Sequence, residues 1–171
     1  LAAYWEASSN RFREQLPRAR LTIVEGLSAN IAEWITSGRA DLGLLYNPDA
    51  QPELEITPLL REPLCLVEPA AARAKRTAPK PLPLRELGSF PLILPERHQS
   101  IRRLLQTQAT AAGVKLDIAW EVSSVPAIID LVCARVGYAV LTASAVAASG
   151  RSAQLAVRPI VDPELISVLF L

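Results

Sequence analysis

The sequence predicts an α/β fold, and its composition, the alternation of its segments and its turn residues support that prediction. Half of the 171 residues are hydrophobic and 20% are charged, as in an ordinary globular domain. Short apolar runs alternate with segments whose apolar residues recur every three to four positions, so strands alternate with helices. Glycine, proline, asparagine and aspartate separate these segments. Alternation of this kind predicts a largely parallel sheet with helices on both faces, in one domain or two small lobes.

The first third of the chain predicts a helix and then a strand–helix–strand unit. Apolar spacing predicts a helix over residues 1–16. A strand is predicted over residues 20–25, a helix over residues 28–37 that stops at Gly38, and a second strand over residues 41–46. The short crossover between two apolar strands predicts a right-handed βαβ unit.

The remainder continues the alternation. Residues 54–67 predict two extended segments that Pro58 and Pro63 interrupt, and residues 68–83 predict a basic surface loop with a short helix. The further predicted elements are strands over residues 90–94, 116–121 and 138–142, and helices over residues 100–112 and 125–135.

One plan of residues occurs twice. Residues 25–45 align without a gap onto residues 121–141, although few identities match. Each copy has an acidic residue, a hydroxyl residue (Ser28 or Ser124) at a helix start, an apolar helix, an arginine and a strand. If the helices belong to facing lobes, their N-termini present unpaired N–H groups and about half a positive charge each, which suits a small anion. The alternative is that each serine is a plain N-cap, which stabilises its helix by about 1 kcal/mol.

A third candidate segment joins a predicted strand to a predicted helix at residues 94–103. It contains His98, the only histidine in the sequence, and Ser100, which suits the N-cap of the following helix. His98 is either a solvated loop residue or a ligand contact. Arg102 and Arg103 point to different sides of the helix, so we expect at most one to face a carboxylate in a cleft and the other to be a surface charge.

Charge and cysteine content exclude several classes of function. The 18 basic and 17 acidic residues give a net charge of +1, so this chain lacks the basic excess of a nucleic-acid binder. Cys65 and Cys133 lie in apolar stretches, which predicts buried free thiols and a reducing compartment. No apolar run is long enough to span a membrane.

Catalytic apparatus is not visible in the sequence. With one histidine, no metal-ligand spacing, no nucleophile elbow and no glycine-rich phosphate loop, we predict neither an enzyme nor a cofactor or metal. A triad of Ser28, His98 and an aspartate is a geometric possibility that sequence alone leaves open.

Three quoted stretches carry a family resemblance. They are PRARLTIVEGLSANIAEWITSGRADLGLLY, with Gly38 and Asp41; ITPLLREPLCLVEP, followed by the Leu84, Leu87 and Pro91-Leu92-Ile93 segment; and EVSSVPAIIDLVCARVGYAVLTASAV. Their order and spacing, from about residue 11 to residue 171, resemble the effector-sensing domain of LysR-type transcriptional regulators.

The resemblance implies an α/β fold of two Rossmann-like lobes with mostly parallel sheets, similar to type 2 periplasmic binding proteins. Two crossover segments, near residues 60–68 and 157–163, would join the lobes. Lobe one would comprise residues 1–62 and 160–171 and would lack its first strand, and lobe two would comprise residues 63–159.

The resemblance also implies that a small metabolite, expected to be anionic, binds in the cleft between the lobes. Family members often have threonine or serine directly after Glu-Gly, where this sequence has Leu27, so a more apolar pocket is expected. The implied effector-binding residues are Leu27, Ser28, Pro95, His98, Ser100, Ser123, Ser124 and Val125.

Partners follow from the same resemblance. We expect dimers, with Tyr4, Trp5 and Phe12 of the first helix as interface candidates, and tetramers of the full-length protein. DNA would be bound only by a helix-turn-helix domain outside this sequence. We expect the protein to act in the cytoplasm and not to bind a membrane. The alternative is a solute-binding protein of a transport system with the same fold, which a signal peptide upstream would distinguish.

Overall fold

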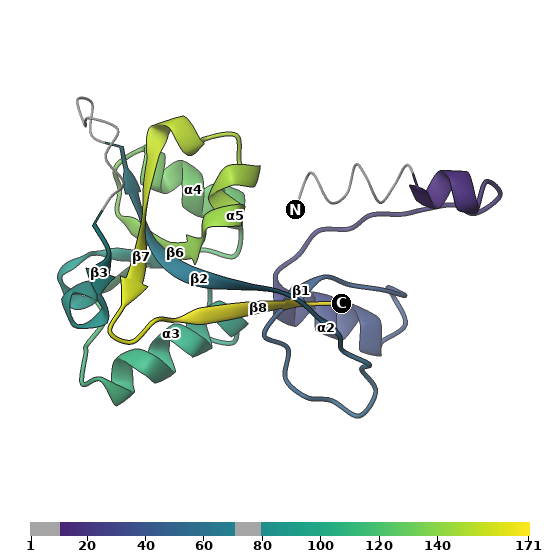
Figure 1. Ribbon diagram of the computed structural model, residues 1–171, viewed down its shortest axis with the longest axis horizontal. Helices are drawn as coiled ribbons and strands as arrows, with labels where there is room; N and C mark the ends of the chain where they lie inside the picture. Colours follow the sequence, from purple (N-terminus) through teal and green to yellow (C-terminus); the bar gives the residue numbers. More distant parts are fainter. Residues whose placement is uncertain (1–10, 71–79) are drawn as a thin grey trace.

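The computed structural model describes residues 11–70 and 80–171, which form an eight-stranded sheet with helices around it (Figure 1). The strands follow the order β1-β8-β2-β6-β4-β5, and β7 pairs with β2 and β3. The strands are β1 (Leu45–Tyr46), β2 (Pro58–Pro69), β3 (Leu82–Pro83), β4 (Leu92–Leu94), β5 (Ile118–Glu121), β6 (Tyr138–Thr142), β7 (Leu155–Val161) and β8 (Ile166–Phe170). The helices are α2 (Ser28–Thr36), α3 (Ser100–Ala111), α4 (Val125–Cys133) and α5 (Ala143–Ala148), with 3-10 helices at Leu84–Ser89 and Ser152–Gln154.

Strand β2 belongs to both halves of the molecule. Its first part pairs with β8 as far as Pro63, and its second part, from Leu64 onward, pairs with β6 and β7. The chain returns through β7 and then β8, and Figure 1 shows β2 and β8 side by side between the two groups of helices. The outward crossover predicted near residues 60–68 therefore lies in β2. The return crossover lies between β7 and β8.

The larger half has helices on both faces of its sheet, as the sequence predicts. Side chains alternate along a strand, so Leu92 and Leu94 of β4 join a buried cluster with α3, whereas Ile93 joins a second cluster with α4 and α5. All three side chains are fully buried.

Parallel pairing occurs where helices connect successive strands. β4 pairs in parallel with β5 and β6, which α3 and α4 connect, and β3 pairs in parallel with β7. The pairs that β2 and β8 make are antiparallel, because the chain runs out along β2 and back along β7 and β8. The sheet is therefore mixed, with its parallel part in the second half of the molecule.

The strand predicted over residues 20–25 does not form, and neither does the βαβ unit that depends on it. Leu21, Ile23 and Val24 are about half exposed, and no described strand pairs with them. A strand needs a neighbour to take its N–H and C=O groups, and an apolar sequence run does not supply one. The strand predicted over residues 41–46 is reduced to β1.

Two glycines explain how α2 packs without that strand. A Cβ atom at Gly26 would lie 2.6 Å from the Trp34 ring, and one at Gly43 would lie 2.6 Å from Ile31. The helix therefore rests directly on the backbone before and after it. The Glu25-Gly26 pair marks this close approach rather than the end of a strand.

Other boundaries agree closely with prediction. β6 has the predicted bounds, and α3 and α4 end one and two residues early. The two extended segments predicted over residues 54–67 are an exception: β2 runs unbroken through Pro63, so the interruption predicted there is wrong. Neighbouring groups carry the ladder, since Leu64 N–H donates to Leu165 O at 2.7 Å. Residues 11–15 are helical, as predicted. Tyr4, Trp5 and residues 71–79 lie outside the described residues.

Candidate ligand-binding site

A cavity of about 240 Å³ lies between the two halves of the molecule. One wall comes from α2 and the loop after β1, and the other comes from the start of α3. Among the side chains that line it are Ser28, Glu33 and Thr36 of α2, Tyr46 and Asp49 after it, and His98, Ser100 and Arg103.

The first turn of α2 is fixed to strand β1 at this cavity. Leu27 is the N-cap, with an extended backbone and no side-chain cap. Ser28 is the first helical residue, and its Oγ accepts a hydrogen bond from Tyr46 N at 2.9 Å. Ser28 is therefore not a plain N-cap, because its hydroxyl joins two elements that form the wall.

The turn after β1 is shaped by Asn47. This residue has φ +43°, a conformation that asparagine tolerates better than most residues. Its side chain donates to Ser167 Oγ and accepts from Val168 N, both at 2.8 Å. The loop that carries Asp49 is thus held to β8.

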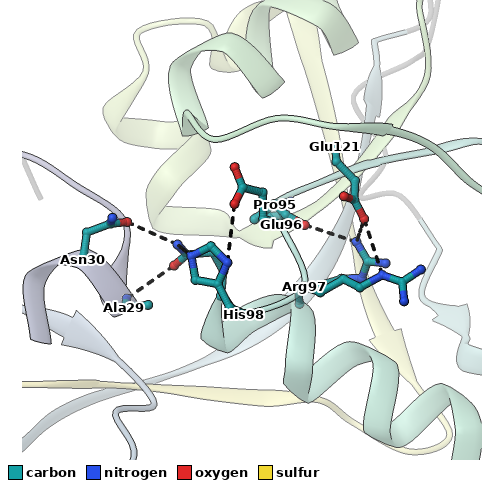
Figure 2. Close-up of polar contacts among 9 residues, drawn as sticks. Ala29, Asn30, Pro95, Glu96, Arg97, His98 and Glu121 are labelled. Atoms are coloured by element: carbon teal, nitrogen blue, oxygen red, sulfur yellow. Dashed lines mark hydrogen bonds and ion pairs between the residues drawn. The ribbon is translucent and has the colours of Figure 1, made fainter. Parts of the chain in front are cut away.

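Gln99 connects the start of α3 to α2 beside the cavity and was not singled out from the sequence. The residue is 4% exposed. Its Oε1 accepts from Ala29 N at 3.3 Å, and its Nε2 donates to Asn30 Oδ1 at 3.2 Å. Figure 2 shows Ala29 and Asn30 of α2 facing the loop that carries His98. No pattern singles out this glutamine, apart from its place between His98 and Ser100.

His98 is engaged within its own loop. Its Nδ1 lies 3.4 Å from Glu96 Oε2, and its Nε2 lies 2.9 Å from Gln99 Nε2 (Figure 2). A neutral ring protonated on Nδ1 satisfies both contacts, because Nε2 then accepts from the Gln99 amide. Among the described residues Ser28 and His98 share no hydrogen bond, so the triad that the sequence left open is not assembled.

Arg103 makes the second contact across the cavity. Its Nη1 and Nη2 donate to the two carboxylate oxygens of Asp49, each at 2.8 Å. These hydrogen bonds lower the pKa of the Asp49 carboxyl and raise the pKa of Arg103. Both side chains are largely exposed to solvent.

Arg102 behaves differently from the surface charge that the sequence predicted. Its side chain is 2% exposed and donates to Pro95 O at 3.1 Å and to Glu121 Oε1 at 3.2 Å (Figure 2). That prediction is wrong, because Arg102 lies under the loop before α3 and holds it to the end of β5. Arg103 is the one that lines the cavity and contacts a carboxylate there; the sequence predicted that at most one of the two would, without choosing between them.

The structure brings three predicted site residues into one cavity: Ser28, His98 and Ser100. The other five do not line it, and their role in binding stays a prediction. Leu27 caps α2, Pro95 O accepts from Arg102, and exposed Ser124 accepts from Ala127 N at 3.5 Å as the N-cap of α4. Ser123 and Val125 flank that cap. The second helix N-terminus at the cavity is that of α3, not that of α4.

A polar cluster at the junction of the two halves reaches the cavity through Tyr46. The Tyr46 hydroxyl donates to Glu62 Oε2 at 2.6 Å, and Ser144 Oγ donates to the same oxygen at 2.9 Å. Burial and the hydrogen bond to Glu62 raise the pKa of Tyr46. These residues come from β1, β2 and α5, so no local sequence pattern identifies the cluster.

In the part of the chain that the structure describes, the cysteines and the acidic and histidine side chains form no further candidate site. Cys65 is buried and Cys133 half-buried, and both are free thiols, as predicted. Within residues 11–70 and 80–171, no three His, Cys, Asp or Glu side chains form a group that could hold a metal ion. No helix in that part of the chain has the length and apolar character needed to cross a membrane.

Fold and cavity together define an α/β ligand-binding domain with two lobes joined by extended strands. The chain belongs to the LysR substrate binding domain family, whose family model matches residues 8–171. The fold class and family expected from the sequence are thereby confirmed.

Two curated relatives are transcriptional regulators. The chain is 29% identical over 155 residues to the HTH-type transcriptional regulator BbuR of Bordetella bronchiseptica, covering 91% of this chain and 47% of the relative. It is 26% identical over 146 residues to the HTH-type transcriptional activator CmpR of Synechocystis, covering 85% of this chain and 47% of that relative. The chain thus spans about half the length of these relatives. They do not favour the alternative of a transport solute-binding protein.

Solved structures share the fold. The regulatory domain of CcmR from Synechocystis in complex with 2-PG superposes with a TM-score of 0.77 at 17% identity, over 99% of this chain and 81% of that one. The effector binding domain of a BenM variant gives a TM-score of 0.76 at 21% identity, over 96% of this chain and 76% of that one.

Proposed function

We propose that this chain is the effector-sensing domain of a LysR-type transcriptional regulator and binds a small anionic metabolite in the cavity between its lobes. The observation that carries this proposal is that both lobes contribute walls to one cavity. A ligand that fits the closed arrangement better than the open one shifts their equilibrium, by no more than its difference in affinity. The domain would pass this shift to a DNA-binding domain elsewhere in the protein.

The polar groups at the cavity suit a carboxylate. In the first turn of α2, the N–H groups of Ser28 and Asn30 have no hydrogen-bond partner among the described residues. Such groups, with the positive end of the helix dipole, bind anions. The carboxylate of Glu33 lines the same cavity, so a hydroxyl or ammonium group on the effector would also find a partner. Small hydroxy acids and amino acids are therefore the first compounds to test.

We propose lobe boundaries from the strand pairing. Strand β2 changes partners between Pro63 and Leu64, next to the predicted division after residue 62. On the return, β7 pairs with strands of lobe two and β8 pairs with β1 of lobe one. The second boundary would thus lie within residues 162–165, a few positions beyond the predicted residue 160.

The remaining expectations follow from the proposed role. We propose a non-catalytic domain that acts in the cytoplasm, where its DNA target lies, and that associates as dimers, and as tetramers in the full-length protein. Support for the absence of catalysis comes from the site itself, since His98 contacts Glu96 and Gln99 rather than a serine hydroxyl.

Thermal-shift screening of the 171-residue chain against hydroxy acids and amino acids tests the proposal. We expect at least one compound to raise the melting temperature and calorimetry to give one site per chain. Ser28→Ala and Arg103→Gln should weaken its affinity, whereas Ser152→Ala, a change at an exposed serine that does not line the cavity, should not. Equal weakening by Ser152→Ala, or binding that neither cavity variant alters, would overturn the assignment of the cavity.

A further inference from the structure

Two side chains of lobe two form hydrogen bonds with lobe one. Gln99 reaches the first turn of α2, where it contacts Ala29 N at 3.3 Å and Asn30 Oδ1 at 3.2 Å. Arg103 reaches the loop after β1, where it makes two hydrogen bonds of 2.8 Å with Asp49. Both side chains come from one end of α3, so the two contacts form or break together when the lobes move.

The Gln99 carboxamide is fully used in this arrangement. Its oxygen accepts one hydrogen bond, and its two N–H groups point to Asn30 Oδ1 and His98 Nε2. Because Gln99 is 96% buried, its amide depends on protein partners for these hydrogen bonds. Separating the lobes would remove two of the three, so the residue favours the arrangement in which the lobes are in contact.

The Arg103–Asp49 pair adds to this contact, although less strongly. The pair is bidentate, which is the favourable geometry for arginine and a carboxylate. Because both side chains are largely exposed, water and salt weaken it. Gln99 is therefore the dominant contact and the ion pair the secondary one.

We propose that Gln99, assisted by the Arg103–Asp49 pair, is a latch that holds the two lobes together in the absence of effector. The latch deepens the proposed function, since it concerns the same cleft, and it would set the resting position from which an effector shifts the lobes. Weakening it raises the population of the open arrangement. The apparent affinity of an effector that prefers the closed arrangement would then fall in proportion.

Distance measurements between the lobes test the latch without an effector. Spin labels on Ser37→Cys, after α2, and Thr107→Cys, on α3, report the separation in a Cys65→Ala, Cys133→Ala background; both label sites are exposed. We expect a longer, broader distance distribution in Gln99→Ala with Asp49→Asn than in the parent. Gln106→Ala, an exposed glutamine on the same helix, is the control and should leave the distribution unchanged. Identical distributions in all three proteins would overturn the latch.

Amide hydrogen exchange distinguishes loss of the Gln99 contact from unfolding of α2. In Gln99→Ala the Ala29 N–H loses its acceptor, and we expect it to exchange about three- to tenfold faster, as the loss of one hydrogen bond implies. The Ile31 N–H, which donates to Leu27 O at 3.1 Å, should keep its protection if α2 remains folded. Unchanged protection at Ala29 would overturn the proposal. Failure of the ligand screen would not, because neither measurement uses a ligand.

Discussion

The pKa of the Asp49 carboxyl is set mainly by its contact with Arg103. Two hydrogen bonds from Arg103 lower its pKa. The stabilisation from this pair is therefore present above the pKa of the unfolded chain, about 3.9, and is lost as the pH falls through the lower pKa of the folded state.

A carboxyl NMR titration checks this prediction. We expect the pKa of Asp49 to rise toward its ordinary value in Arg103→Gln and to rise partly in high salt. Arg151→Gln, which removes the ion pair with Asp130 instead, is the control and should leave the Asp49 titration unchanged. An Asp49 titration that is the same with and without Arg103 would contradict the structure.

The surroundings of Cys65 lower the nucleophilic reactivity of its thiol. Burial within β2, with a smaller effect of Glu62, raises the pKa of its thiol to about 11. Because only the thiolate is nucleophilic, we expect Cys65 to remain unmodified by iodoacetamide at pH 8 in the folded chain and to react in denaturant. Mass spectrometry of the digested protein measures both. Fast modification of folded Cys65 would show that the strand is not buried there.

Among the elements, β4 carries both hydrophobic clusters of lobe two. Leu94 is fully buried beside α3, so Leu94→Ala should lower the free energy of unfolding by about 2–5 kcal/mol. Leu42→Ala is the matched control, because Leu42 is 77% exposed, and should change it by about 0.5 kcal/mol or less. Denaturant titration compares the two, and similar losses would contradict the assignment of the core.

Elements were predictable from sequence where apolar residues have a partner nearby. The spacing of apolar residues in β4, α3 and β6 follows from the face that each element buries. Their predicted bounds therefore agree with the structure within two residues. Residues 20–25 have an equally apolar sequence but lie exposed. Strand formation there depends on a neighbouring strand, which a local pattern does not encode.

Contacts between the lobes were beyond sequence analysis for a similar reason. Ser28 and His98 could be selected because each lies at a helix start or strand end, where α/β folds place ligands. Gln99 acquires its role only when α3 approaches α2, 70 positions away in the chain. Glu62 likewise acts through Tyr46 and Ser144, which come from different lobes.

At the scale of the whole molecule, Glu62 couples the lobes at their junction. One carboxylate oxygen accepts hydrogen bonds from Tyr46 of lobe one and Ser144 of lobe two. Substitutions that share a partner are not additive, with coupling energies of about 0.5–3 kcal/mol. We therefore expect Tyr46→Phe and Ser144→Ala to affect the free energy of unfolding non-additively in a double-mutant cycle.

The matched cycle pairs Ser144→Ala with Tyr138→Phe. Tyr138 is the first residue of β6, at the end of the strand away from α5 and Ser144. Its ring packs against Phe90 and is not part of the Glu62 cluster. This second cycle should be additive within about 0.5 kcal/mol. Additivity in both cycles would mean that Glu62 binds the two hydroxyls independently, and that lobe one can move without disturbing α5. Coupling in the first cycle alone would make the junction a single unit, through which a change at Tyr46 in the cavity reaches lobe two.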